Sequence, residues 1–190
     1  MKVGVLALQG AFREHAEVLD ALGVDAVRVK TPAHLDAVDG LIIPGGESTT
    51  IGYLLQTSDL VDPLTERLRA GMPALGTCAG MILLASDVLD GRDDQVALAA
   101  IDISVRRNAY GRQRESFETD VSIDGFRAPF RGVFIRAPVI ERTGQGVEVL
   151  AEHDGRSVMA RQDAVTVCSF HPELSGDLRV HERFLQEVAP

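Results

Sequence analysis

The sequence predicts an α/β protein built on a three-layer, open and mostly parallel sheet, with an added β excursion in its second half. Residues 3–8 form a continuous apolar run, which is typical of a parallel strand covered on both faces. Strand-like and helix-like segments then alternate through the first half, as they do when helices cover both faces of a parallel sheet. Short β-like runs separated by turn residues fill much of the second half.

The first half is expected to contain four strands. After Gly10, apolar residues recur on one helical face as far as Leu22, and Gly23 is a suitable C-terminal stop. Residues 24–29 alternate as a second strand. A third strand over residues 38–43 ends at a Pro-Gly-Gly turn. The remaining elements expected here are helices over 49–56, 60–70 and 80–85 and a strand over 74–77.

The second half is expected to be mainly β, with a final helix over residues 180–188. Asp154-Gly155 predicts a tight hairpin between two of its strands. No repeat, low-complexity tract or linker interrupts the chain, so we expect one domain over residues 1–190. The β-like runs are residues 101–106, 118–123, 132–136, 147–153, 157–160 and 165–170.

The composition indicates a soluble, cytoplasmic globular protein. The 190 residues include 28 acidic and 19 basic side chains, a formal charge of −9, which argues against nucleic-acid and anionic-membrane binding. Two cysteines are too few for a disulfide framework and suit a reducing compartment. The N-terminus does not have the pattern of a signal peptide, and the longest uncharged stretch is shorter than the ~20 residues that span a bilayer.

The segment Gly76-Thr77-Cys78-Ala79-Gly80 has the glycine-flanked form of a nucleophile elbow, with cysteine as the nucleophile. Such a turn lifts the side chain above the sheet and directs the following backbone N–H groups to the same space. The start of a helix also favours the thiolate. The alternative interpretation is a structural cysteine packed between two glycines.

Two more segments follow predicted strands. His171 and Glu173 lie two residues apart, so in an extended segment they share a face and can act as a base and its orienting carboxylate. Gly45 and Gly46 leave backbone N–H groups accessible for an oxyanion hole. Each segment alone would be taken for an ordinary turn. Together they fit a site at the carboxyl ends of the strands of an open α/β sheet.

These residues resemble a known family. The chain is similar to class I (triad) glutamine amidotransferases, and more narrowly to the glutaminase subunits of pyridoxal 5′-phosphate synthase (the PdxT/SNO family). The resemblance runs from end to end and implies their flavodoxin-like class I glutaminase fold. Its segments are residues 6–10 (LALQG), 44–50 (PGGESTT), 76–81 (GTCAGM), 107–113 (RNAYGRQ), 133–138 (VFIRAP) and 170–174 (FHPEL).

The resemblance implies a role for each matching residue. Cys78 would be the nucleophile, His171 the base and acid, and Glu173 the orienting residue. Backbone N–H groups of Gly46 and Ala79 would form the oxyanion hole, which Gln9 and Gly10 would help to set when a partner docks. L-Glutamine would be held by Gly46, Glu47, Ser48, Arg107, Ile135 and Arg136.

The chemistry agrees with these residues. Arg107 suits the carboxylate of glutamine, because a guanidinium binds carboxylates bidentately. Amide hydrolysis through a thioester needs no cofactor, and the histidine and cysteine spacings predict no metal site. Cys168 is expected in the core, although a disulfide with Cys78 is an alternative. His15 is expected to be a packing or partner-facing residue rather than a catalyst.

The resemblance also implies a partner, a (β/α)₈-barrel synthase subunit that uses the ammonia within a large hetero-oligomer. Three alternatives compete with this hypothesis. One is a glutaminase that serves another synthase, such as imidazole glycerol phosphate synthase. Another is a stand-alone cysteine hydrolase or chaperone-like protein on a related fold. The third is a catalytically silent subunit, which the complete triad disfavours.

Overall fold

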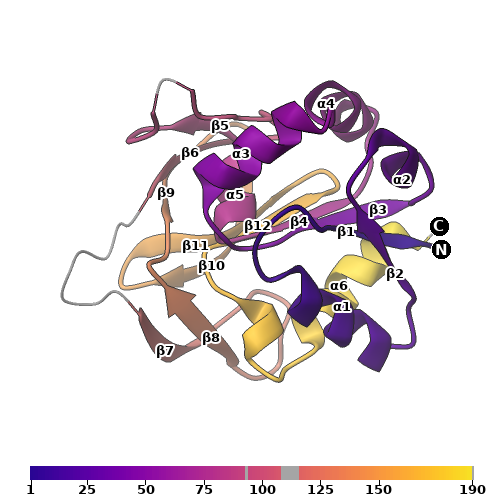
Figure 1. The fold of residues 1–190 in the computed structure, drawn as a ribbon. Helices are drawn as coiled ribbons and strands as arrows, with labels where there is room; N and C mark the ends of the chain where they lie inside the picture. Colours follow the sequence, from indigo (N-terminus) through magenta and orange to yellow (C-terminus); the bar gives the residue numbers. More distant parts are fainter. Residues whose placement is uncertain (93, 108–115, 190) are drawn as a thin grey trace.

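The structure, a computed structural model, describes residues 1–92, 94–107 and 116–189. One large sheet crosses the molecule in the strand order β2-β1-β3-β4-β12-β11-β9-β6-β5, and β10 pairs with β11 (Figure 1). The strands of this sheet are β1 (Val3–Leu6), β2 (Ala26–Val29), β3 (Gly40–Ile43), β4 (Ala74–Thr77), β5 (Ala85–Val88), β6 (Ile101–Arg106), β9 (Val139–Thr143), β10 (Glu148–His153), β11 (Arg156–Gln162) and β12 (Val165–Cys168).

Helices cover both faces of the sheet, so the three-layer α/β prediction is confirmed (Figure 1). One apolar core lies under α2 to α5 and includes Leu35, Ile51 and Leu64. The other lies under α1 and α6 and includes Leu19 and Phe184. The helices are α1 (Phe12–Ala21), α2 (Pro32–Asp36), α3 (Ser48–Thr57), α4 (Val61–Arg69), α5 (Ala79–Leu84), the 3₁₀ turn η2 (Pro172–Leu174) and α6 (Arg179–Val188).

The sheet changes from parallel to antiparallel at β12. This strand pairs parallel with β4, placing Cys168 opposite Thr77, and antiparallel with β11. The strands from β2 to β12 are therefore parallel, whereas β11, β9 and β6 pair antiparallel. The consequence is that the chain leaves β4 and β12 at the same edge, side by side.

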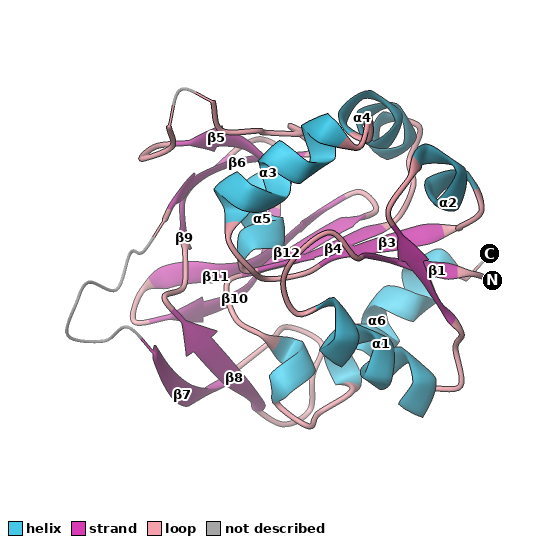
Figure 2. Cartoon of the chain, viewed as in Figure 1, coloured by secondary structure: helices cyan, strands magenta, loops and turns pink. Residues whose placement is uncertain are grey.

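A separate two-stranded sheet, β7 (Ser116–Val121) with β8 (Phe130–Ile135), is the predicted β excursion (Figure 2). Phe134 of β8 packs against Phe170, with ring centroids 5.6 Å apart. The backbone N–H of His171 donates to the carbonyl of Val133 at 2.8 Å. These contacts fix β8 beside the segment that follows β12.

Most predicted elements are present, with boundaries shifted by a few residues. The predicted hairpin is confirmed: Asp154 and Gly155 have φ angles of 50° and 70° between β10 and β11. The sequence-based prediction missed α2, β5 and β9, and it wrongly ended the helix after Cys78 at residue 85, which begins β5. It was also wrong to expect an extended segment through Glu173, because Pro172–Leu174 form the 3₁₀ turn η2. Of the segment 107–113, only Arg107 belongs to the described residues. In the described part of the chain, no helix has the length and apolarity that crossing a membrane requires.

Candidate active site

Cys78 occupies the turn between β4 and α5, as the elbow motif predicts. Its φ of 50° and ψ of −104° are unusual for a residue with a side chain, and such strain is common at nucleophile elbows. The flanking glycines have a steric reason. A Cβ on Gly80 would collide with the carbonyl oxygen of Ile43, and one on Gly76 would lie 2.8 Å from the Gly80 backbone. The turn is therefore closed to side chains on both sides of the cysteine.

His171 and Glu173 form a buried pair at the end of the neighbouring strand β12. The Nδ1 atom of His171 lies 2.7 Å from Oε1 of Glu173, and both side chains are largely or wholly shielded from solvent. Burial acts to lower the pKa of His171. Its hydrogen bonds to Cys78 and Glu173 and the negative charges of these groups outweigh burial and raise the pKa to about 10. Because Nδ1 faces Glu173, Nε2 is the nitrogen left for Cys78.

The Gly45–Glu47 loop after β3 borders the same space. The Gly45 N–H donates to Thr77 Oγ1 at 3.0 Å, and the Gly45 carbonyl accepts from the N–H of Ala11 at 2.9 Å. The Glu47 N–H donates to Oε1 of Gln9 at 2.9 Å. The segment between β1 and α1 thus contacts this loop, hereafter the glycine loop, on one side, and Thr77 of β4 contacts it on the other.

Glu47 has a structural role in addition to its predicted contact with glutamine. Its carboxylate caps α3 by accepting from the N–H groups of Thr49 and Thr50, at 3.2 and 2.7 Å. Arg107 lies beside it, with Nη2 3.5 Å from Glu47 Oε1 and Nη1 3.4 Å from Thr49 Oγ1. The guanidinium is therefore held at the start of α3.

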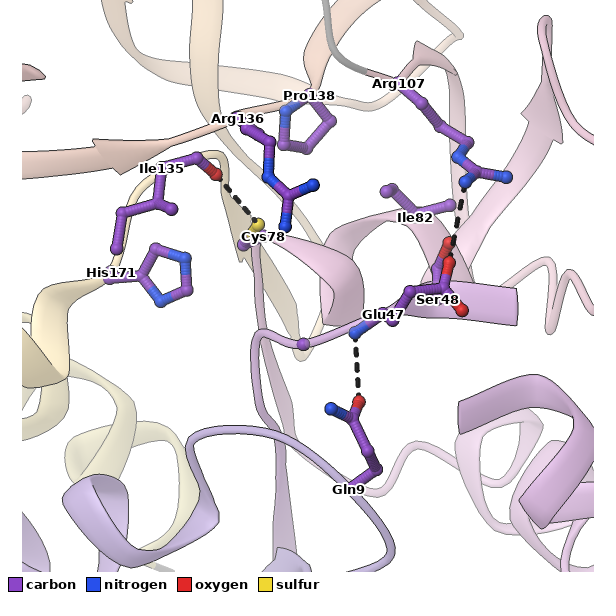
Figure 3. A pocket seen from close by; sticks show the side chains of 11 residues that line it. Gln9, Glu47, Ser48, Cys78, Ile82, Arg107, Ile135, Arg136, Pro138 and His171 are labelled. Atoms are coloured by element: carbon purple, nitrogen blue, oxygen red, sulfur yellow. Dashed lines mark hydrogen bonds and ion pairs between the residues drawn. The ribbon is translucent and has the colours of Figure 1, made fainter. Parts of the chain in front are cut away.

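A cavity of about 340 Å³ lies above the cysteine (Figure 3). This volume is at the low end for ligand pockets and suits a small molecule. It brings together Gly46, Glu47, Ser48, Cys78, Arg107, Ile135, Arg136 and His171, all predicted from the sequence. Glu173 lies behind His171, and Ala79 is buried in α5. Ile82 and Pro138, which also line the cavity, were missed because an apolar residue carries no chemical signal in sequence.

Ile135 and Arg136 end strand β8 at the mouth of the cavity. The Ile135 carbonyl faces Cys78 Sγ at 4.0 Å (Figure 3). Arg136 has a φ of 42°, an uncommon conformation for a residue with a side chain. Such backbone strain tends to persist where the surrounding structure holds a functional group in place.

Two sequence expectations concern residues behind the cavity. Cys168 is completely buried within β12 and both cysteines are free, so the core interpretation is confirmed and the disulfide alternative is wrong. His15 is also completely buried, so the partner-facing interpretation is wrong. Among the described residues, no group of three or more His, Cys, Asp or Glu side chains is arranged to hold a metal ion.

Comparison with known proteins identifies the family to which this chain belongs. The sequence profile of the SNO glutamine amidotransferase family matches residues 5–190. The chain belongs to this family. It is 47% identical to a protein whose crystal structure is described as a glutamine amidotransferase, with a TM-score of 0.95 and full coverage of both chains. The structure of PurLQS from Thermotoga maritima, 15% identical with a TM-score of 0.66, covers 98% of this chain and 99% of its own, and shares the fold alone.

Three relatives with curated names are each called pyridoxal 5′-phosphate synthase subunit PdxT. The Mycobacteroides abscessus protein is 56% identical over 98% of this chain and 96% of its own. The Nocardia farcinica protein is 57% identical over 98% of this chain and 85% of its own. The Carboxydothermus hydrogenoformans protein is 52% identical over 99% of this chain and 98% of its own. The predicted resemblance is therefore confirmed over nearly the whole length.

Proposed function

We propose that this chain is the glutaminase subunit of a pyridoxal 5′-phosphate synthase, which hydrolyses L-glutamine to L-glutamate and ammonia. The observation that carries the proposal is the assembly of Cys78, His171 and Glu173 at one edge of the sheet, with Cys78 and His171 lining a single small cavity. The names of relatives that are 52–57% identical over nearly the whole chain support the synthase assignment.

Glutamine enters with its amide toward the sulfur and its α-carboxylate toward the arginines. Arg107 binds the carboxylate, and Arg136 adds positive charge at the rim. Glu47, Ser48 and the Ile135 backbone supply the remaining polar contacts, including acceptors for the α-ammonium group. This arrangement leaves the amide carbon next to Cys78.

Hydrolysis follows in two steps. The Cys78 thiolate, stabilised by the imidazolium of His171, attacks the amide carbon, and the N–H groups of Gly46 and Ala79 stabilise the oxyanion. The intermediate collapses to a thioester as His171 gives its proton to the departing ammonia. His171 then takes a proton from water, whose hydroxide attacks the thioester and releases glutamate. Glu173 keeps Nδ1 of His171 protonated and oriented throughout.

Ammonia is lost to water unless an acceptor is close, so this reaction needs a synthase partner. The partner is the (β/α)₈-barrel subunit that combines the ammonia with sugar phosphates in a large hetero-oligomer, and the complex works in the cytoplasm. When this chain is combined with that subunit, glutamine should support pyridoxal phosphate formation. Failure of glutamine where ammonium salts succeed would refute the assignment to this synthase.

The two cysteines provide a matched test of the nucleophile. Cys78→Ala should abolish glutamate release, because no other thiol faces the cavity in the described residues, and binding of the synthase subunit should persist. Cys168→Ala removes the other buried thiol without touching the cavity and should keep turnover within about twofold. Glutaminase activity in Cys78→Ala equal to that of the native chain would overturn the mechanism.

A further inference from the structure

Behind the triad lies a buried pair of histidines that the mechanism above does not use. His15 of α1 and His181 of α6 are both completely shielded from solvent. Nδ1 of His15 lies 2.8 Å from Nε2 of His181. On the other side of the ring, His15 Nε2 lies 3.2 Å from Thr77 Oγ1 and 3.3 Å from Glu173 Oε2. The contacts therefore run from His181 through His15 to the carboxylate of Glu173 in the triad.

Glu173 is held between two imidazoles. Its Oε1 bonds to His171 at 2.7 Å, while Oε2 faces His15. The His15 contact is longer, and Oε2 has no hydrogen-bond partner of ordinary geometry among the described residues. Hydrogen bonds of this kind often tighten only when substrate is bound. His15 Nε2 is thus the donor available to a buried oxygen that would otherwise be left without one.

The contacts favour one tautomer of the pair. If His181 donates its Nε2–H to His15 Nδ1, then the ring hydrogen of His15 is on Nε2, the nitrogen that faces both Thr77 Oγ1 and Glu173 Oε2. The unprotonated Nδ1 of His181 then lacks a partner among the described residues, and Thr77 does not donate its hydroxyl hydrogen to His15. The opposite form would let Thr77 donate to His15. It would also turn a nitrogen lone pair toward the carboxylate and bury the Nδ1–H of His181 without an acceptor, a costly arrangement.

The charges around His15 keep it neutral. The groups that face it are His181 from α6, Thr77 from β4, and Glu173 with its partner His171. Burial first, and then repulsion from His181 and His171 in their protonated forms, lower the pKa of His15 well below its usual value. A neutral imidazole can still donate one hydrogen bond, whereas a second imidazolium beside His171 would compete for the same carboxylate.

We propose that His15 is a positioning residue that anchors Glu173 through its Nε2–H, and that His181 holds His15 in this tautomer. This inference rests on the proposed glutaminase mechanism, in which Glu173 orients His171. The same imidazole contacts Thr77, whose hydroxyl oxygen accepts from the Gly45 N–H. His15 thereby joins the base side of the site to the loop that carries the oxyanion hole.

Kinetics of the native chain and its variants with the synthase subunit test the proposal. In His15→Leu we expect kcat for glutamate release to fall about 10- to 100-fold, short of losing the base itself, with KM changed by less than about threefold. The basic limb of the kcat–pH profile should move to lower pH, because a less firmly held Glu173 stabilises the imidazolium of His171 less well, and that group has a pKa of about 10 in the native chain. His15→Gln, which keeps an N–H near the Nε2 position, should restore most of kcat and the profile.

A destabilised helix is the competing explanation, and Leu19→Ala separates it. Leu19 is buried on the same helix α1 but is not part of the His15–Glu173 cluster, so this control should lower the melting temperature without moving the pH profile. If His15→Leu matches Leu19→Ala, with native kcat and an unshifted basic limb, then the proposal is wrong. His181→Leu should lower kcat less than His15→Leu, and His181→Gln should recover it.

Histidine ¹⁵N NMR of the full native chain tests the tautomer without any variant or activity. At pH 7 we expect His15 and His181 to be neutral and protonated at Nε2, and His171 to be protonated on both nitrogens. A His15 ring that is protonated at Nδ1 or doubly protonated would overturn the inference. Because Cys78→Ala separately tests the nucleophile, failure of the histidine pair can be told apart from failure of the proposed function.

Discussion

The pKa values of two buried histidines, His171 and His181, shift in opposite directions because their neighbours differ. His171 contacts an anionic carboxylate and the sulfur of Cys78, and its pKa rises to about 10 despite burial. His181 is buried beside a neutral imidazole, and desolvation lowers its pKa to about 4. One residue type thus supplies a charged group at the reacting end of the cluster and a neutral one at its far end.

The lowered pKa of His181 predicts a loss of stability in acid. The unfolded histidine binds a proton below about pH 6.5, whereas the folded one resists protonation until about pH 4. The native state therefore loses on the order of 3 kcal/mol as the pH falls through this window. In urea unfolding at pH 7, 5.5 and 4, the free energy of unfolding should fall less steeply with decreasing pH in His181→Gln than in the native chain.

His34 provides the control for this pH series, because it is exposed on α2. His34→Gln should follow the native curve. An unchanged slope in His181→Gln would show that protonation of His181 does not drive the acid transition.

At the scale of elements, the site depends on a turn that is packed too closely to admit another side chain and on a helix start that shares a carboxylate with the cavity. The β4–α5 turn brings the Gly80 Cα against the carbonyl of Ile43, and this approach carries Cys78 above the sheet. The start of α3 is capped by Glu47, a residue of the cavity wall, so the local helix signal and the site share one carboxylate. Both contacts explain why motif residues here are also structural residues.

Gly80→Ala should both destabilise the chain and impair turnover. The added methyl must displace the Ile43 carbonyl or the elbow, which we expect to lower the free energy of unfolding by about 1–3 kcal/mol. Glutamate release should fall as well, because Cys78 moves with the turn. Urea unfolding and steady-state kinetics measure the two effects.

Gly23→Asn is the comparison for Gly80→Ala. Gly23 has a φ of 73° and open space around it, and asparagine tolerates this conformation. This variant should remain close to native in both assays. If Gly80→Ala is equally silent, the close approach does not determine the elbow.

At the scale of the whole molecule, the two halves of the chain meet in one cavity. The parallel half supplies Cys78 and the glycine loop, and the second half supplies His171 and the β8 end at Ile135. The N-terminal segment reaches in from a third direction, where Gln9 occupies the Glu47 N–H. A partner that docks near this segment can thus act on the Gly45–Glu47 loop.

We therefore expect the isolated chain to hydrolyse glutamine slowly and to accelerate at least about tenfold when the synthase subunit is added. The physical reason is that the Gly45–Glu47 loop must be ordered for catalysis. In the isolated chain the Glu47 N–H donates to Gln9, and the Gly45 carbonyl accepts from Ala11, so the N-terminal segment holds these polar groups of the loop. Glutamate release measured with and without the synthase tests this. An inert protein at equal concentration should have no effect, and full turnover of the chain alone would contradict the expectation.

Local patterns were enough to predict the order of most elements and the three motifs, because each depends on neighbouring residues. The short helix α2 has a local signal, Thr31 as N-cap before Pro32, but is too brief for apolar periodicity. Strand β9 was missed because charged residues end it and only Val139 and Ile140 are buried. His15 and His181 lie 166 residues apart and share no motif.

The amino-acid sequence alone predicts the α/β class, the glycine-flanked turn at Cys78, the His171–Glu173 pair and the family, since these reside in short segments whose chemistry is local. Tertiary contacts were needed to show that β12 lies parallel beside β4, which brings Cys78 and His171 together. They were also needed to show that His15 turns inward to Glu173 instead of outward to a partner. Such contacts join distant parts of the chain, and their energies come from burial and packing that no single segment encodes.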